Sequence, residues 1–113
     1  MGKEKRRNPR LKERLPFEIG SQDAAISTET KNISCSGAYC YIDRALPVMS
    51  KVKISMVILS KNITCEGVVL RYDPPQKEDN QSGWNTAIMF TKISRQDKNT
   101  IADYVKYQLE KNG

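Results

Sequence analysis

The sequence predicts an all-β domain in which six short strands close into an antiparallel, split or Greek-key-like barrel, with one helix at the C-terminus. Apolar and polar residues alternate through most of the chain as far as Thr91, which is typical of strands with one buried face. After Thr91 the apolar residues recur every four positions, which indicates a helix. Short antiparallel strands leave sheet edges exposed, and closure into a small barrel removes those edges.

The chain has 113 residues, which is the length of a single domain. We expect residues 1–14 to form a flexible basic arm and residues 15–113 to form the barrel domain with its C-terminal helix. The predicted strands are the runs in which apolar residues alternate with polar ones, residues 15–20, 24–33, 38–42, 52–59, 63–72 and 84–91.

Polar and turn-forming residues predict the connections between these strands. Residues 32–37 are expected to form a polar turn between the second and third strands. Lys61 and Asn62 predict a tight hairpin turn between the fourth and fifth strands. Residues 73–83 form a polar loop with two prolines, which we expect to be the most mobile internal segment.

The helix is predicted over about residues 94–111. Ser94 with Asp97 has the form of a capping box in which Asp replaces Glu. Ile101, Val105 and Leu109 follow at intervals of four residues, so they share one face of a helix. We expect this apolar face to cover one open end of the barrel.

Positive charge is concentrated at the N-terminus. The net charge is +6, and residues 1–14 hold seven Lys or Arg side chains against Glu4 and Glu13. Five of the six net charges therefore lie in the arm, which predicts an anionic partner that the arm contacts. Long duplex nucleic acid is not an expected partner, because it usually meets a wider basic surface.

Cysteine and histidine usage argues against metal binding and disulfides. The chain has no histidine, and its three cysteines (Cys35, Cys40 and Cys65) form no C-x-x-C pair. We expect the cysteines to be small, buried, apolar residues of a protein in a reducing compartment. We expect the protein to bind no metal or cofactor and to lie in the cytoplasm. No apolar run has the length of a membrane span. An enzyme is not expected, because no recognisable catalytic motif is present.

Two short clusters carry the chemistry that points to function. Residues 6–10 read Arg-Arg-Asn-Pro-Arg, and residues 32–37 read Asn-Ile-Ser-Cys-Ser-Gly. Arginine binds phosphate through two parallel hydrogen bonds, stacks on aromatic rings and can bind O6 and N7 of guanine. In the second cluster, Asn and Ser supply donors and acceptors, and Gly37 permits a positive φ or a close approach of the backbone. Each cluster also has a simpler interpretation, a solvated arm and an ordinary turn.

Together and in this order, the two clusters resemble the two signature motifs of the PilZ domain, a bacterial receptor for cyclic di-GMP. The resemblance extends to residues 67–71, residues 87–90 and the start of the helix, so it covers nearly the whole chain. It implies the same fold, a six-stranded barrel with a C-terminal helix. It also implies that the arm folds over the ligand and that the signal passes to an unidentified protein effector.

The resemblance further implies the residues of the site. Arg6, Arg7 and Arg10 would bind the phosphates and guanines of the ligand. Asn32 stands where Asp is commoner in the family, and it would accept hydrogen bonds from the N–H groups of a guanine. Ser34 and Gly37 would help to hold that guanine and the neighbouring phosphate. Additional candidates flank the motifs or offer an aromatic wall: Lys5, Ser36 and Trp84.

Two other functions remain open from the sequence. One is a PilZ-like protein that has lost the ligand and works as a protein adaptor. The other, less favoured, is a small barrel that binds single-stranded nucleic acid through its basic arm. Motility, adhesion or biofilm formation, and exopolysaccharide synthesis are all pathways that the resemblance leaves possible.

Overall fold

The computed structural model describes residues 11–20, 25–73 and 83–112. Residues 1–10 of the predicted arm and most of the predicted 73–83 loop lie outside this part of the chain. The described elements follow the predicted order, and their bounds agree with the predicted ones to within two residues. They are β1 (Pro16–Gly20), β2 (Ala25–Ser34), β3 (Gly37–Ile42), β4 (Lys51–Ile58), β5 (Lys61–Asp73), β6 (Trp84–Lys92) and α1 (Arg95–Asn112).

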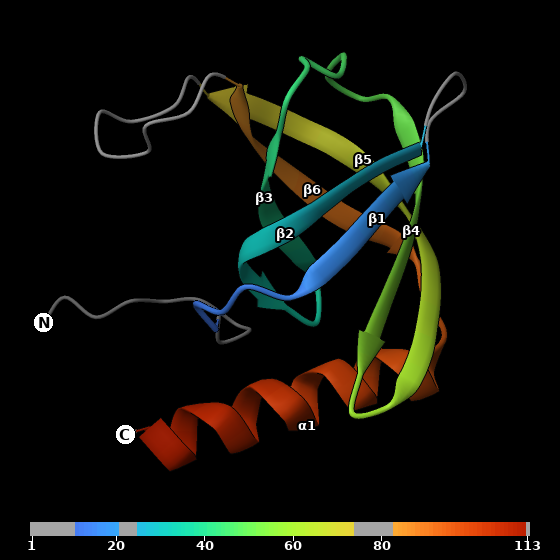
Figure 1. Cartoon of the computed structure of the whole chain (residues 1–113). Coiled ribbons are helices and arrows are strands. Elements are labelled where there is room, and N and C mark those ends of the chain that lie inside the picture. The colour runs from blue at the N-terminus through green and yellow to red at the C-terminus, as the bar shows by residue number, and fades with distance from the viewer. Residues whose placement is uncertain (1–10, 21–24, 74–82, 113) are drawn as a thin grey trace, which may run out of the picture.

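The predicted barrel is confirmed. The strands form a closed barrel in the order β1-β2-β3-β6-β5-β4, and neighbouring strands are antiparallel. Closure comes from the pairing of β1 with β4, in which Phe17 lies opposite Met56 and Ile19 lies opposite Ile54. Figure 1 shows the barrel with α1 lying across one of its ends.

Alternation of side chains builds the core. In β4 every second residue is buried and every intervening residue is exposed, as expected when one face of a strand lines a barrel interior. β1 and β5 follow the same pattern over most of their length. The largest fully buried hydrophobic side chains come from five strands and from the helix, and they are Phe17, Ile19, Ile33, Ile42, Ile54, Ile58, Ile63, Val69, Ile101 and Val105.

The helix begins as the sequence predicts. The Ser94 hydroxyl accepts a hydrogen bond from the backbone N–H of Asp97 at 3.0 Å, so Ser94 is the N-cap. Ile101 and Val105 are buried against the barrel, whereas Leu109 is 38% exposed. The apolar face of the helix therefore covers the barrel end at Ile101 and Val105. It no longer packs fully against the barrel at Leu109, near the C-terminus of the helix. Within the described residues, no helix is long and apolar enough to cross a membrane.

The predicted position of the β4–β5 turn is wrong. Ile58 pairs with Lys61, and Val57 pairs with Asn62, so Lys61 and Asn62 already belong to β5. The two turn residues are instead Leu59 and Ser60, with φ angles of 54° and 65°. Two successive positive φ angles are those of a type I′ turn, which matches the right-handed twist of the two strands. The geometry of the hairpin therefore prevails over the usual residue preferences for this turn.

Candidate functional site

The second sequence cluster lies on the hairpin between β2 and β3. Asn32 and Ser34 belong to β2, Gly37 begins β3, and only Cys35 and Ser36 form the turn. The predicted polar turn over residues 32–37 is therefore shorter than expected. Ser34 pairs with Gly37 across the hairpin. The three motif residues are thus held in strand geometry and not in a loose loop.

The Ser34 side chain stabilises this turn. Ser34 is 2% exposed, and its Oγ accepts a hydrogen bond from the backbone N–H of Ser36 at 3.2 Å. The Oγ atoms of Ser34 and Ser36 also lie 3.1 Å apart, at hydrogen-bond distance. The carbonyl oxygen of Ser36 accepts from the N–H of Phe90 at 2.9 Å, which joins the turn to β6.

Gly37 is needed where β3 passes close to β6. A Cβ added to Gly37 would lie 2.4 Å from the carbonyl oxygen of Ile88, far closer than any normal contact. None of the described glycines has a positive φ, so Gly37 does not serve a left-handed turn. Its role in the fold is the close approach of two strands, and this approach leaves the outer surface without a side chain at that point.

A short segment of the arm is part of the fold, and we call residues 11–15 the strap. The N–H of Leu11 donates to the carbonyl oxygen of Ile33 at 2.8 Å, and the N–H of Ile33 donates back to Leu11 at 2.9 Å. Leu11 is 3% exposed and belongs to the core. The described chain therefore begins beside Ile33, the residue between Asn32 and Ser34 of the motif.

Further hydrogen bonds fix the rest of the strap. The Thr30 hydroxyl donates to the carbonyl oxygen of Glu13 at 2.6 Å and accepts from the N–H of Leu15 at 3.0 Å. Tyr104 of α1 donates its hydroxyl proton to Oε2 of Glu13 at 2.6 Å. Burial, followed by this hydrogen bond and the charge of Glu13, raises the pKa of Tyr104 to about 12. The strap is thus held by β2 on one side and by the helix on the other.

Beside Asn32, the outer surface carries a cluster that the sequence interpretation missed. Tyr39 pairs with Asn32, and its hydroxyl donates to Oδ2 of Asp73 at 3.1 Å. The guanidinium of Arg71 lies 5.9 Å from the centre of the Tyr39 ring and donates to the same Asp73 oxygen at 3.3 Å. The available sequence signal was the alternation of β3, which turns Tyr39 outward two residues after Gly37.

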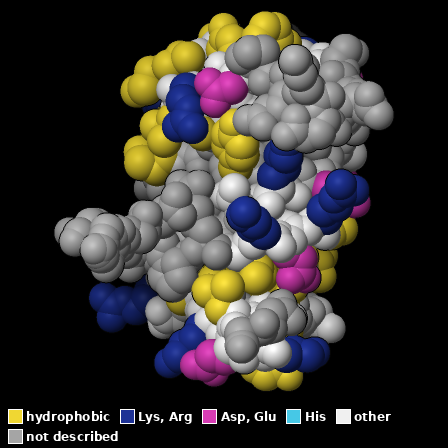
Figure 2. Space-filling model, turned by 90° about the vertical axis from the view of Figure 1, so that its left-hand side faces the viewer, with side chains coloured by type: hydrophobic (Ala, Val, Ile, Leu, Met, Phe, Trp, Pro, Cys, Tyr) yellow, Lys and Arg dark blue, Asp and Glu magenta, His cyan; other side chains and the backbone are white. Residues whose placement is uncertain are grey.

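A lysine extends the polar character of this surface. Lys31 Nζ donates to Oδ1 of Asn85 at 3.2 Å. The side of the barrel on which β3 lies in Figure 1 is shown in Figure 2, where Lys and Arg side chains are spread over the described surface among fewer Asp and Glu side chains. Among the described side chains on this side, positive charge predominates, which favours the approach of an anion.

The structure brings only some predicted site residues together. Asn32, Ser34, Ser36 and Gly37 share one hairpin, but Lys5, Arg6, Arg7 and Arg10 lie outside the described residues. Trp84 pairs with Ile42 at the far end of β3, about 17 Å along the strand from Gly37. It packs edge-on against Tyr72 with ring centres 5.2 Å apart, so the hairpin and Trp84 are not brought together.

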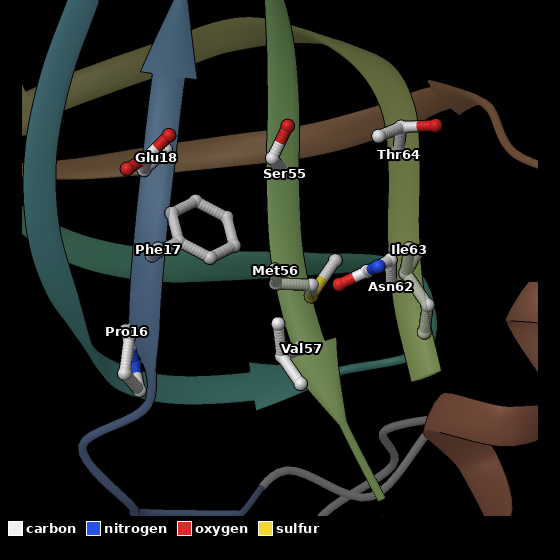
Figure 3. Close-up of a pocket in the computed structure, with 9 residues that line it drawn as sticks. All are labelled: Pro16, Phe17, Glu18, Ser55, Met56, Val57, Asn62, Ile63 and Thr64. Atoms are coloured by element: carbon white, nitrogen blue, oxygen red, sulfur yellow. The ribbon is translucent and has the colours of Figure 1, made fainter. Parts of the chain in front are cut away.

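The other sites that the sequence raised are placed clearly. Cys40 and Cys65 are buried as predicted, and burial raises their thiol pKa values to about 12 and about 11. Cys35 is half-buried in the hairpin turn. A separate pocket of about 470 Å³ lies at β1, β4 and β5, where Figure 3 shows Glu18, Ser55 and Thr64 side by side. None of the predicted site residues that the structure describes lines that pocket.

Comparison with protein families decides the classification. The model of the PilZ domain matches residues 4–107 of this chain. The chain belongs to the PilZ domain family. The matched range includes both sequence clusters, the strap, the barrel and most of the helix of this PilZ domain. Among curated proteins, no match was found.

Solved structures share this fold at low sequence identity. The Bacillus subtilis inhibitor of motility MotI (DgrA) matches with a TM-score of 0.83 and 18% identity, over 97% of this chain and 54% of that chain. MrkH from K. pneumoniae in complex with c-di-GMP matches with a TM-score of 0.79 and 16% identity, over 96% and 53%. The PilZ domain of Escherichia coli YcgR with c-di-GMP matches with a TM-score of 0.74 and 9% identity, over 96% and 97%. This PilZ domain spans about half the length of the MotI and MrkH chains.

Proposed function

We propose that this PilZ domain is a receptor for cyclic di-GMP, in which the arginine cluster of residues 6–10 and the β2–β3 hairpin bind one ligand together. The observation that carries the proposal is the pairing of Leu11 with Ile33. Arg10 is bonded directly to Leu11, so the arginine cluster is attached to the barrel between Asn32 and Ser34. This attachment supports the proposal that the two clusters, which are 22 residues apart in the sequence, bind one ligand.

The chemistry of the two clusters is complementary to a cyclic dinucleotide. Arg6, Arg7 and Arg10 supply guanidinium groups for two phosphates and for the guanine rings. Asn32 offers an amide oxygen to the N–H groups of a guanine. The missing side chain at Gly37 lets the ligand approach the β3 backbone.

The solved relatives add support from their own ligands. The MrkH and YcgR structures are complexes with c-di-GMP, and both share the fold of this chain. By this proposal the protein binds and relays a signal and does not catalyse a reaction. Ligand binding orders the arm over the hairpin, and the changed surface is recognised by a protein effector in the cytoplasm. A regulated step in motility or biofilm formation fits the family.

Titration calorimetry with cyclic di-GMP tests the proposal. The wild type should bind with micromolar or tighter affinity, and GTP should give no comparable heat. Arg10→Ala should weaken binding by about 10-fold or more, because it removes a charge-assisted contact. Lys12→Ala is the matched control, since it removes one positive charge from an exposed side chain two residues away.

The same titration separates the alternative functions. A folded wild type that binds no cyclic di-GMP would refute the receptor and favour the protein adaptor. Binding that Lys12→Ala weakens as much as Arg10→Ala would indicate a general polyanion binder. In that case single-stranded nucleic acid should bind with a steep dependence on salt.

A further inference from the structure

One row of outward-facing side chains runs from the motif across four neighbouring strands. The paired positions are Asn32 on β2, Tyr39 on β3, Ala87 on β6 and Arg71 on β5. Neighbouring strands lie about 4.8 Å apart, so the row extends about 14 Å from Asn32 to Arg71. Asn32, Tyr39 and Ala87 are half-buried and Arg71 is exposed. The motif residue Asn32 is therefore one end of a longer surface.

Two β-bulges create this row. The β2–β3 register shifts between Thr30 and Asn32, and the β5–β6 register shifts between Val69 and Arg71. Without the extra residue in β2, Lys31 would lie opposite Tyr39. Without the extra residue in β5, an apolar Leu70 would lie opposite Ala87. Bulges commonly redirect side chains beside functional sites, and both bulges here place a polar side chain in the same row.

Tyr39 and Arg71 form the second half of the surface. The small side chain of Ala87 stands between them, so the guanidinium reaches to 5.9 Å from the centre of the Tyr39 ring. Asp73 accepts hydrogen bonds from the Tyr39 hydroxyl and from Nε of Arg71, which orients both groups. The Arg71 side chain is 63% exposed, and its two terminal nitrogens are distinct from the Nε that contacts Asp73.

We propose that Tyr39 and Arg71 form a guanine subsite of the receptor, with the Tyr39 ring stacking on the base and the terminal nitrogens of Arg71 donating to O6 and N7. This inference rests on the proposed function, because cyclic di-GMP supplies the guanine. The chemistry favours guanine over adenine, since adenine presents N7 together with a donor amino group where guanine presents two acceptors. Asp73 is a positioning residue that acts through its two partners.

The test compares three alanine variants of the full chain in titration calorimetry with cyclic di-GMP. Arg71→Ala should weaken binding by about 10-fold, the loss of one bidentate contact to guanine. Tyr39→Ala should weaken it by a similar factor through lost stacking. Arg44→Ala is the matched control, because Arg44 is also exposed and also pairs through Nε with a carboxylate, Asp43, at 3.1 Å. It lies beyond the far end of β3 and should bind like the wild type.

Competition by cyclic di-AMP tests the assignment to guanine. The ratio of the affinities for cyclic di-GMP and cyclic di-AMP should fall in the Arg71→Ala variant. It should stay unchanged in the Arg44→Ala variant. An unchanged preference in Arg71→Ala would overturn the guanine assignment. Arg71→Ala that binds cyclic di-GMP as tightly as Arg44→Ala would overturn the subsite while leaving the receptor intact. A wild type that binds no cyclic di-GMP would overturn the receptor and the subsite together.

Discussion

The β2–β3 and β4–β5 hairpins are both closed by two residues, yet they are stabilised in different ways. The β4–β5 turn has two residues with positive φ, Leu59 and Ser60, and Leu59 is 60% exposed. The β2–β3 turn has no residue with positive φ, and the buried Ser34 hydroxyl binds its backbone. The β2–β3 turn is stabilised by a side-chain hydrogen bond and by contact with β6. The β4–β5 turn depends on the type I′ geometry of its backbone.

This difference shows that the motif residues have a structural role before any ligand arrives. Ser34 accepts a hydrogen bond inside the turn, and Gly37 allows β6 to pass. Substitutions in the β2–β3 hairpin should therefore lower stability as well as binding. Substitutions in the β4–β5 turn should change stability alone.

Gly37→Ala should have the largest effect. The new Cβ would lie 2.4 Å from the carbonyl oxygen of Ile88, so β3 and β6 must move apart. We expect a loss of ~2–3 kcal/mol in the free energy of unfolding, measured by urea denaturation. Gly20→Ala is the control, because its Cβ would lie 3.8 Å from the nearest atom that the structure describes, an ordinary contact. Equal losses in the two variants would show that the close approach at Gly37 is not limiting.

Ser34→Ala should have an intermediate effect. It removes the acceptor for the Ser36 N–H inside a half-buried turn, which should cost ~1–2 kcal/mol in the free energy of unfolding. Ser60→Ala in the other turn removes a hydroxyl from an exposed position and serves as the comparison. A variant at position 34 as stable as wild type would mean that the Ser34 hydroxyl serves the ligand alone.

Replacing Leu59-Ser60 by Asn-Gly should give the smallest effect and the opposite sign. Both positions have positive φ, which Asn and Gly adopt with less strain than Leu and Ser. We expect a gain of ~0.5–1 kcal/mol in the free energy of unfolding, with cyclic di-GMP affinity unchanged. A change in ligand affinity in this double variant would contradict the separation between the two hairpins.

The strands and the helix could be predicted because burial on one face makes apolar residues recur at regular intervals. The interval is two residues in the strands and about four in the helix. The β4–β5 turn could not, since Lys61 and Asn62 match the usual turn composition and the strand register selects Leu59 and Ser60. The motif on β2 and β3 was recognised by its residues. The Tyr39–Arg71 pair was missed, because its residues are far apart in the chain and meet across Ala87 only through the bulge in β5. The bond between Glu13 and Tyr104 joins residues 91 positions apart and leaves no local pattern.

The strap also has a practical consequence for shortened versions of this protein. A truncation that follows the predicted boundary at residue 14 would delete Leu11 from the core and Glu13 from its bond with Tyr104. Such a chain would lose ligand affinity and folding stability at once, and the two losses could not be told apart. A chain that starts at Leu11 removes the arginine cluster of residues 6–10 and keeps every described contact of the strap. In this shortened form, ligand binding can be lost while the strap still joins the barrel to its helix.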